Sequence, residues 1–262
     1  MDDASIWLAL FLTTIAGLST GIGGLIAFGA KSTDERFLSF SLGLSAGVMV
    51  YVSFMEMMPM SVELLSKSYA SRMAELYMLL SFFAGIALIA IIDRLVPEDE
   101  NPHEMQGNSK SGKMPLKRTG VMMALAIGIH NFPEGLATFA SSMTQLDVAV
   151  PIVVAVAIHN IPEGIAVSVP IFHATGSKKK ALKYSFLSGL AEPVGGLVGF
   201  MLLMTFWTPT VNALLLAFVS GIMIYISFDE LLPGTERYGH HHCGIGGVVC
   251  GMAVMAASLL LL

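Results

Sequence analysis

The chain has 262 residues and a formal net charge of -5; only 13% of its residues are charged, while 55% are hydrophobic. Soluble domains carry about 25% charged residues, so this composition excludes a soluble globular enzyme and a disordered chain. A nucleic-acid-binding domain would need a basic face, and none is expected here. The two cysteines, Cys243 and Cys250, lie in an apolar segment and exclude a disulfide framework. The composition favours an all-α protein in a lipid bilayer.

Apolar stretches separated by short polar breaks predict eight transmembrane helices, each about 20 residues long as a bilayer requires. In chain order we expect them at Ile6–Phe28, Phe37–Met60, Leu76–Val96, Thr119–Met143, Val148–Phe172, Tyr184–Trp207, Val211–Leu232 and Gly244–Leu262. No segment between them is large enough to fold alone, so residues 1–262 are predicted to form a single transmembrane domain. The longest polar stretch, about residues 97–118, is predicted to be a flexible loop.

The basic residues predict the orientation of these spans. Of the 14 Lys and Arg residues, all except Lys67 and Arg72 lie in the first, third, fifth and seventh connections or at the helix ends beside them. By the positive-inside rule these connections face the cytoplasm, and both termini lie outside it. The chain begins Met-Asp-Asp without a basic segment, so we expect the first span to stay in the mature protein.

The sequence contains two internal repeats, and each repeat relates two spans that cross the membrane in opposite directions. The segment Gly47-Val-Met-Val-Tyr-Val-Ser-Phe-Met-Glu-Met-Met-Pro59 of the second span recurs in the seventh as Gly221-Ile-Met-Ile-Tyr-Ile-Ser-Phe-Asp-Glu-Leu-Leu-Pro233. The fourth span carries His-Asn-Phe-Pro-Glu-Gly at 130–135, and the fifth carries His-Asn-Ile-Pro-Glu-Gly at 159–164. Inverted repeats of this kind are common in transporters. They predict a pseudo-two-fold axis in the membrane plane and a site near it at the midplane.

The repeated hexapeptide has the side chains of a metal site. His130 and Glu134 are four residues apart and share a helical face, as do His159 and Glu163. An isolated ionised carboxylate in mid-membrane costs about 2.5–3.5 kcal/mol, so several such groups require protonation or bound cations. The acids concerned are Glu56, Glu134, Glu163 and Glu192. Two imidazoles beside carboxylates, with amide oxygens from Asn131 and Asn160, suit a divalent transition metal.

Other polar side chains allow two interpretations. Glu56 and Glu192 are either metal ligands or acids paired to a neighbouring helix. Met49 either lends a thioether to the metal or packs in the core. Asp229 and Glu230, near the inner end of the seventh span, are either a metal exit station or solvated end charges. His240, His241 and His242, in the last connection, either buffer metal or sense pH, or they are a solvated run.

The two hexapeptides resemble those of the ZIP (Zrt-, Irt-like) family of divalent metal transporters. The similarity covers essentially the whole chain, is greatest to a branch of bacterial zinc importers, and extends to Ser53-Phe-Met-Glu-Met-Met-Pro59, Ala174-Thr-Gly-Ser177, Ser188-Gly-Leu-Ala-Glu192 and Asp229-Glu-Leu-Leu-Pro233. It implies an importer of Zn²⁺, and also of Fe²⁺ and Mn²⁺, in the bacterial cytoplasmic (inner) membrane. Such proteins are expected to work by alternating access, with one helix group moving past the other, and commonly as homodimers.

The resemblance also implies a binuclear metal centre. One metal would be held by His130, Glu134, His159 and Glu163 with Met49 nearby, and the second by Asn131, Asn160, Glu192 and Glu56, with Glu134 and Glu163 bridging. The third connection is not rich in His, so metal sensing there is not expected, and the run His240–His242 is the other candidate for it.

A membrane-embedded di-metal oxidase is the alternative function, because two His and several Glu also build di-iron sites. The usual Glu-x-x-His helix pairs are missing, and inverted repeats favour transport. We therefore predict a transporter and not an enzyme.

Overall fold

The computed structural model describes residues 3–29, 35–95, 128, 131–143, 146–203, 206, 208–236 and 239–261. Helices are the only regular elements in these ranges, and seven candidate spans there are long and apolar enough to cross a membrane. The predicted fourth span is described only at residue 128 and at 131–143, and the predicted loop 97–118 lies outside the described residues. The polytopic all-α fold is confirmed.

The helices follow the predicted spans closely and extend a few residues past most of them. In chain order they are α1 (Asp3–Gly29), α2 (Glu35–Val52), η1 (Ser53–Met57), α3 (Met58–Ser66), α4 (Ser71–Leu95), the helical segment 131–142, α6 (Leu146–Thr175), α7 (Lys178–Gly189), α8 (Ala191–Leu203), α9 (Pro209–Ile226), η3 (Ser227–Leu231), α10 (Leu232–Glu236) and α11 (His241–Leu261).

The sixth span begins earlier than hydropathy predicts. It starts at Lys178 rather than at Tyr184 because the Ser177 side chain caps the helix, accepting a hydrogen bond from the Lys180 backbone N–H at 3.3 Å. The span divides into α7 and α8 at Leu190. Pro193 lacks the N–H that would bond the Gly189 carbonyl, which weakens the helix at this point.

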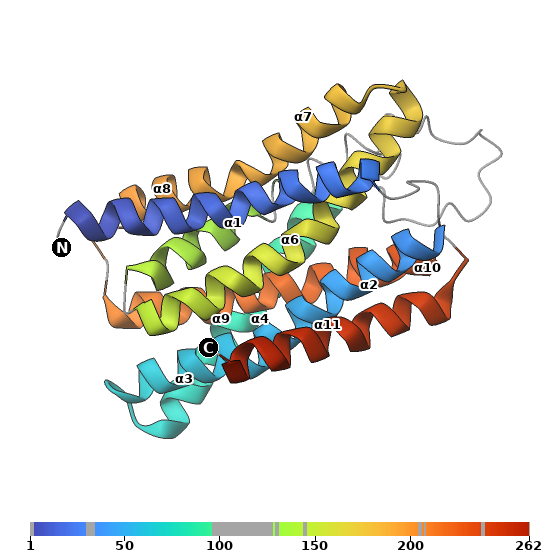
Figure 1. Ribbon diagram of the computed structural model, residues 1–262. Coiled ribbons are helices and arrows are strands. Elements are labelled where there is room, and N and C mark those ends of the chain that lie inside the picture. Colours follow the sequence, from blue (N-terminus) through green and yellow to red (C-terminus); the bar gives the residue numbers. More distant parts are fainter. Residues whose placement is uncertain are drawn as a thin grey trace.

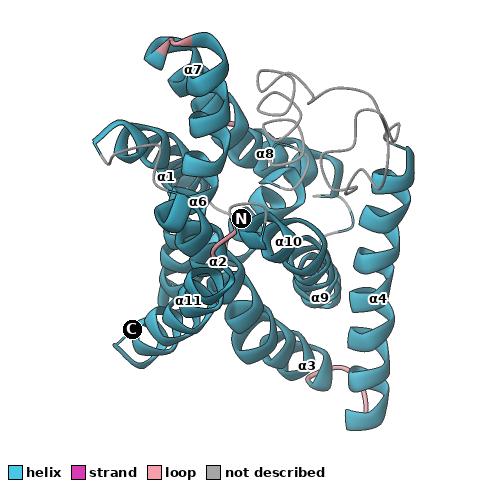
Figure 2. Cartoon of the chain, turned by 90° about the vertical axis from the view of Figure 1, so that its right-hand side faces the viewer, coloured by secondary structure: helices cyan, strands magenta, loops and turns pink. Residues whose placement is uncertain are grey.

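The helices form two bundles (Figures 1 and 2). The first bundle contains α1, the segment 131–142, α6, α7 and α8. The second bundle contains α2 with η1 and α3, α4, α9 with η3 and α10, and α11. At each described glycine where an added Cβ would overlap another helix, that helix belongs to the same bundle. Backbones therefore approach closely within each bundle.

The inverted repeat of the second and seventh spans is visible in the backbone. Both copies contain a π-helical turn at the same place, closed by the Met58 N–H bonding the Ser53 carbonyl and by the Leu232 N–H bonding the Ser227 carbonyl. Each π turn ends two residues before the repeated proline, whose ring would clash with the carbonyl four residues earlier in a regular helix. α2 and α9 run in opposite directions in Figure 1, so the predicted inversion is confirmed.

The connections separate to two ends of the molecule (Figure 1). Both termini and the turn between α3 and α4 lie at one end, and the α6–α7 and α10–α11 connections lie at the other. At the second end, the Lys178 ammonium lies 5.4 Å from the centre of the Phe28 ring, which contacts Phe172 edge-on. We call these the termini end and the basic end. This arrangement agrees with the predicted alternation of the spans.

Candidate metal centre

Four titratable side chains are buried in the first bundle. They are Glu134, His159, Glu163 and Glu192, and none is more than 2% exposed. They come from three helices, namely the segment 131–142, α6 and α8. Burying ionisable groups at this depth is costly unless they pair or bind cations. Their concentration in one bundle therefore marks the candidate site.

Two of these side chains connect the two copies of the hexapeptide. His159 Nε2 lies 2.8 Å from Glu134 Oε1, so the imidazole of one copy contacts the carboxylate of the other. The sequence indicates only that a His and a Glu within one copy share a helical face. The contact between copies requires the two helices to lie side by side, which the sequence alone does not show.

Asn160 connects α6 to two further helices. Its Nδ2 donates hydrogen bonds to the Ala16 carbonyl of α1, at 3.0 Å, and to Glu192 Oε1 of α8. Among the described residues, Asn160 Oδ1 and Glu192 Oε2 are buried and have no hydrogen-bond partner, and the same holds for both polar atoms of the Asn131 amide. Buried oxygens without a donor are costly in lipid. A bound cation would satisfy them.

The glycine that ends each hexapeptide permits this close arrangement. A Cβ on Gly135 would overlap the Glu192 carbonyl of α8, and a Cβ on Gly164 would overlap the Thr20 carbonyl of α1. Equivalent positions of the repeat thus pack backbone to backbone against two different helices of the first bundle. Any larger residue would push the polar side chains apart.

The second bundle contributes contacts that the sequence does not reveal. The Ser45 hydroxyl of α2 lies 3.3 Å from the His159 carbonyl and 3.9 Å from the Met49 sulfur. Met49 is fully buried beside it. The Ser45 hydroxyl thus lies between the Met49 sulfur and the α6 backbone, and Met49 is also part of an apolar cluster. Its role near the metal stays a prediction.

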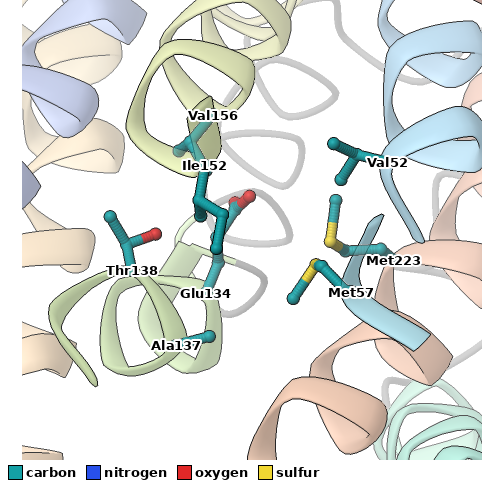
Figure 3. A pocket seen from close by; sticks show the side chains of 8 residues that line it. All are labelled: Val52, Met57, Glu134, Ala137, Thr138, Ile152, Val156 and Met223. Atoms are coloured by element: carbon teal, nitrogen blue, oxygen red, sulfur yellow. The ribbon is translucent and has the colours of Figure 1, made fainter. Parts of the chain in front are cut away.

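A cavity lies between the two bundles beside Glu134 (Figure 3). Glu134, Ala137, Thr138, Ile152 and Val156 line it from the first bundle. Val52, Met57 and Met223 line it from the second. Six of these eight residues are Val, Ile, Met or Ala, so Glu134 faces a largely apolar wall.

Of the other predicted site residues, Glu56, Asp229 and Glu230 lie in the second bundle, and His130 cannot be placed. Glu56 is half-buried in η1 and makes no hydrogen bond or ion pair in the described part of the chain. Asp229 and Glu230 are half-buried in η3. His130 lies outside the described residues. Across the described ranges, no three or more His, Cys, Asp or Glu side chains come close enough to hold a metal, so the full ligand set stays a prediction.

The His run lies at the basic end of the second bundle. His240 precedes α11, and His241 and His242 begin it, with their rings 5.5 Å apart. His241 Nδ1 lies 3.0 Å from Glu236 Oε1, and both side chains are more than half exposed. The run is therefore well separated from the buried cluster and lies at the end of the helix, where both interpretations from sequence stay open.

Buried polar side chains in a multi-pass helical bundle with an inverted repeat are typical of membrane transporters. The comparisons with known proteins give the family. Residues 95–259 match the family model described as ZIP Zinc transporter. The chain therefore belongs to the ZIP zinc transporter family, and it is a transporter rather than an enzyme.

Curated relatives match over nearly the full length. The chain is 57% identical to Zinc transporter ZupT of Streptococcus mutans serotype c over 97% of each protein. It is 55% identical to Zinc transporter ZupT of Akkermansia muciniphila, again over 97% of each. It is 53% identical to Zinc transporter ZupT of Nitratidesulfovibrio vulgaris, over 100% of this chain and 99% of that relative.

Proposed function

We propose that the chain imports Zn²⁺ into the cytoplasm through a binuclear centre between the two hexapeptides and α8, and that it also accepts Fe²⁺ and Mn²⁺. The observation that carries this proposal is the pair of adjacent polar contacts, His159 with Glu134 and Asn160 with Glu192, both buried in one bundle. The first contact offers an imidazole nitrogen, which suits zinc. The second offers only oxygens, which suit harder ions.

The predicted ligands are divided between these two positions. His130, Glu134, His159 and Glu163 hold one metal, while Asn131, Asn160, Glu192 and Glu56 hold the other, with Glu134 and Glu163 bridging. The buried oxygens of Asn131, Asn160 and Glu192 that lack hydrogen-bond partners among the described residues support the second group. Glu56, which lies in the second bundle, would join the centre only in part of the transport cycle.

Alternating access is supported by the division into two bundles. Close backbone contacts hold each bundle together. The described contacts between the bundles are made by uncharged groups, namely apolar side chains such as Val52 and Ile152 and the Ser45 hydroxyl at the His159 carbonyl. Such contacts can be exchanged as one bundle slides past the other. We infer that the first bundle carries the metal past the second.

The positive-inside rule places the basic end in the cytoplasm and both termini outside, in the bacterial inner membrane. Single cysteines near Lys67 should react with an impermeant thiol reagent added to whole cells, and single cysteines near Lys113 should not, in a chain without Cys243 and Cys250. The reverse labelling pattern would show that the topology is inverted.

The homodimer that the resemblance implies can be tested by cross-linking in native membranes.

Uptake by reconstituted protein tests the function directly. Purified chain in proteoliposomes should accumulate radioactive Zn²⁺ above protein-free liposomes, and unlabelled Fe²⁺ and Mn²⁺ should compete. Uptake should fall as the external pH drops through the range in which the His and Glu ligands take up protons, because they bind metal only when deprotonated. No accumulation above the liposome control would refute zinc import, and an increase with acidity would indicate proton cotransport.

A further inference from the structure

Four lysines lie together at the start of α7, at the basic end of the molecule (Figure 1). They are Lys178, Lys179, Lys180 and Lys183. All four are exposed, and in the described part of the chain none of them forms an ion pair. Each of the other described Lys and Arg residues has an acid within four positions of it, as Lys67 has Glu63. No acid occurs between Glu163 and Glu192, so the positive charge of α7 is not compensated along the chain.

The stability of α7 does not account for these lysines. Lys179 and Lys183 are four residues apart, so their ammonium groups repel each other across one helical turn. Cations in the first turn also oppose the helix dipole. The helix begins here because the Ser177 side chain caps it, and that hydrogen bond comes from a backbone N–H, which any residue except proline would supply. The positive-inside rule explains why this connection is basic, but not where on the helix the lysines lie.

An exposed apolar ridge continues from the lysines along α7 and α8. Its side chains follow Lys179 and Lys183 at intervals of three or four residues, so all of them share one helical face. They are Leu187, Leu190, Val194 and Leu197. The Leu190 backbone is helical where the two helices meet, so the face is continuous. The ridge measures about 15 Å along the helix, which is half of the hydrocarbon thickness of about 30 Å. This face therefore combines positive charge at the membrane surface with apolar contact through one leaflet.

Aromatic side chains flank the lysines on the side of α1, which lies beside α7 (Figure 1). The Lys178 ammonium group lies 5.4 Å from the centre of the Phe28 ring, at the end of α1, and that ring contacts Phe172 edge-on. Tyr184 packs against the same cluster. Tyrosine is enriched at the level of the lipid headgroups, because its ring is apolar and its hydroxyl is polar. The lysines next to it therefore lie where the phosphate groups of the lipids lie.

We propose that the first two turns of α7 bind an anionic phospholipid, with the lysine ammonium groups at its phosphate and an acyl chain along the ridge from Leu187 to Leu197. Clusters of lysine beside a membrane span attract anionic lipids. An inorganic phosphate ion shares the chemistry of the headgroup, but it has no apolar part to place on the ridge, so the structure favours the lipid. This proposal does not rest on the proposed transport function.

Fluorescence quenching by lipids brominated in the acyl chain tests the site. The full chain without Cys243 and Cys250 carries a fluorophore at Leu187→Cys, in phosphatidylcholine liposomes with a small fraction of brominated lipid. The matched control carries it at Val249→Cys, an exposed position about as far into α11 from the basic end. At Leu187, brominated phosphatidylglycerol should bind about fivefold more strongly than brominated phosphatidylcholine. At Val249 the two lipids should quench equally. Equal quenching by both lipids at Leu187 would overturn the proposal.

Charge variants assign the preference to the lysines. Lys179→Gln/Lys183→Gln should abolish the preference for phosphatidylglycerol at Leu187, and Lys179→Arg/Lys183→Arg, which keeps the charge, should retain it. If the Gln variant does not fold, high salt serves instead, because it should screen the attraction in the chain with all its lysines. A preference that survives both changes would contradict the proposal. Inorganic phosphate should have the same effect as chloride at equal ionic strength. If phosphate alone removes the preference, the lysines form a free-anion site and the lipid proposal is wrong.

Discussion

The two bundles differ in what they bury. In the first, Glu134, His159, Glu163 and Glu192 are all inaccessible, while the buried polar side chains described in the second are neutral, for example those of Ser53 and Ser220. Most of the electrostatic cost of the fold is thus concentrated in one bundle. The other bundle presents an apolar wall to the cavity, made by Val52, Met57 and Met223.

In the proposed alternating-access cycle, this difference would let an ion cross without being released at the midplane. Glu134, His159, Glu163 and Glu192 belong to one bundle, so movement of that bundle would carry them together. Glu56, a proposed ligand from the second bundle, would enter and leave the centre during this movement. The predictions below test this division from the largest expected effect to the smallest.

Removing a bridging carboxylate should have the largest effect. Glu134→Ala and Glu163→Ala should each lower Zn²⁺ uptake by about 100-fold, because two close cations in a low-dielectric site would lose the charge between them. The matched control is Glu63→Ala, an exposed acid 3.5 Å from Lys67, whose surface pair contributes little. Uptake is measured in proteoliposomes containing equal amounts of protein. Near-normal uptake by either of the first two variants would rule out shared ligands.

Linking the bundles should stop transport reversibly. Cysteines at Val52 and Ile152, on opposite walls of the cavity, would be bridged by a bifunctional methanethiosulfonate reagent, which forms a reducible disulfide with each cysteine, in a chain lacking Cys243 and Cys250. We expect uptake to fall at least about tenfold and to return after reduction, because the bundles can no longer slide. The control pair, Phe54→Cys with Phe82→Cys, lies within the second bundle, where the two rings are 6.3 Å apart. Equal uptake by both linked proteins would show that the bundles do not move relative to each other.

Filling a backbone contact inside the first bundle should destabilise the protein. Gly164→Ala places a methyl group against the Thr20 carbonyl, and overpacking of this kind costs about 1–3 kcal/mol. Gly246→Ala, where an added Cβ meets nothing within 4 Å, should be neutral or slightly stabilising. Thermal unfolding in detergent compares the two. Equal midpoints would mean that the first bundle is loosely packed at the hexapeptide.

The smallest effect expected is a change in selectivity. Glu192→Ala removes an oxygen ligand from the proposed metal position that Asn160 shares with Glu192. It should therefore reduce Fe²⁺ and Mn²⁺ uptake about threefold more than Zn²⁺ uptake. His130→Ala should impair all three ions, because it removes a nitrogen ligand. Competition uptake in cells without their own importers measures both. If Glu192→Ala lowers all three ions equally, the two metal positions act as one unit.

The spans and the inverted repeat were predictable because each is a local property of the sequence. Hydropathy locates the spans, and the two pairs of matching segments identify the symmetry. The choice of candidate residues was also accessible, since a carboxylate in an apolar span is costly wherever it points. Glu134, His159, Glu163 and Glu192 are indeed buried.

The pairing of these residues was not predictable. The contact of His159 with Glu134, and the carbonyl of Ala16 that receives the Asn160 amide, depend on which helices are neighbours. The first span contains no charged residue between Ile6 and Phe28, so nothing in it suggests a link to the site. The contact of Ser45 with the site could not be predicted either, because small hydroxyl residues are common in membrane helices for packing alone.

The π turns at Ser53–Met57 and Ser227–Leu231 have a consequence for how such chains vary. A π turn contains one more residue than the α-helical turn that it replaces, so it is equivalent to a single insertion. Deleting Met55 or Asp229 would regularise the helix and rotate everything beyond it by about 100° relative to the part before it. Insertions and deletions are therefore constrained within the helices of this protein as well as in its connections. In each of these two pentapeptides, the loss of a single residue would change which face the rest of the helix presents to its neighbours.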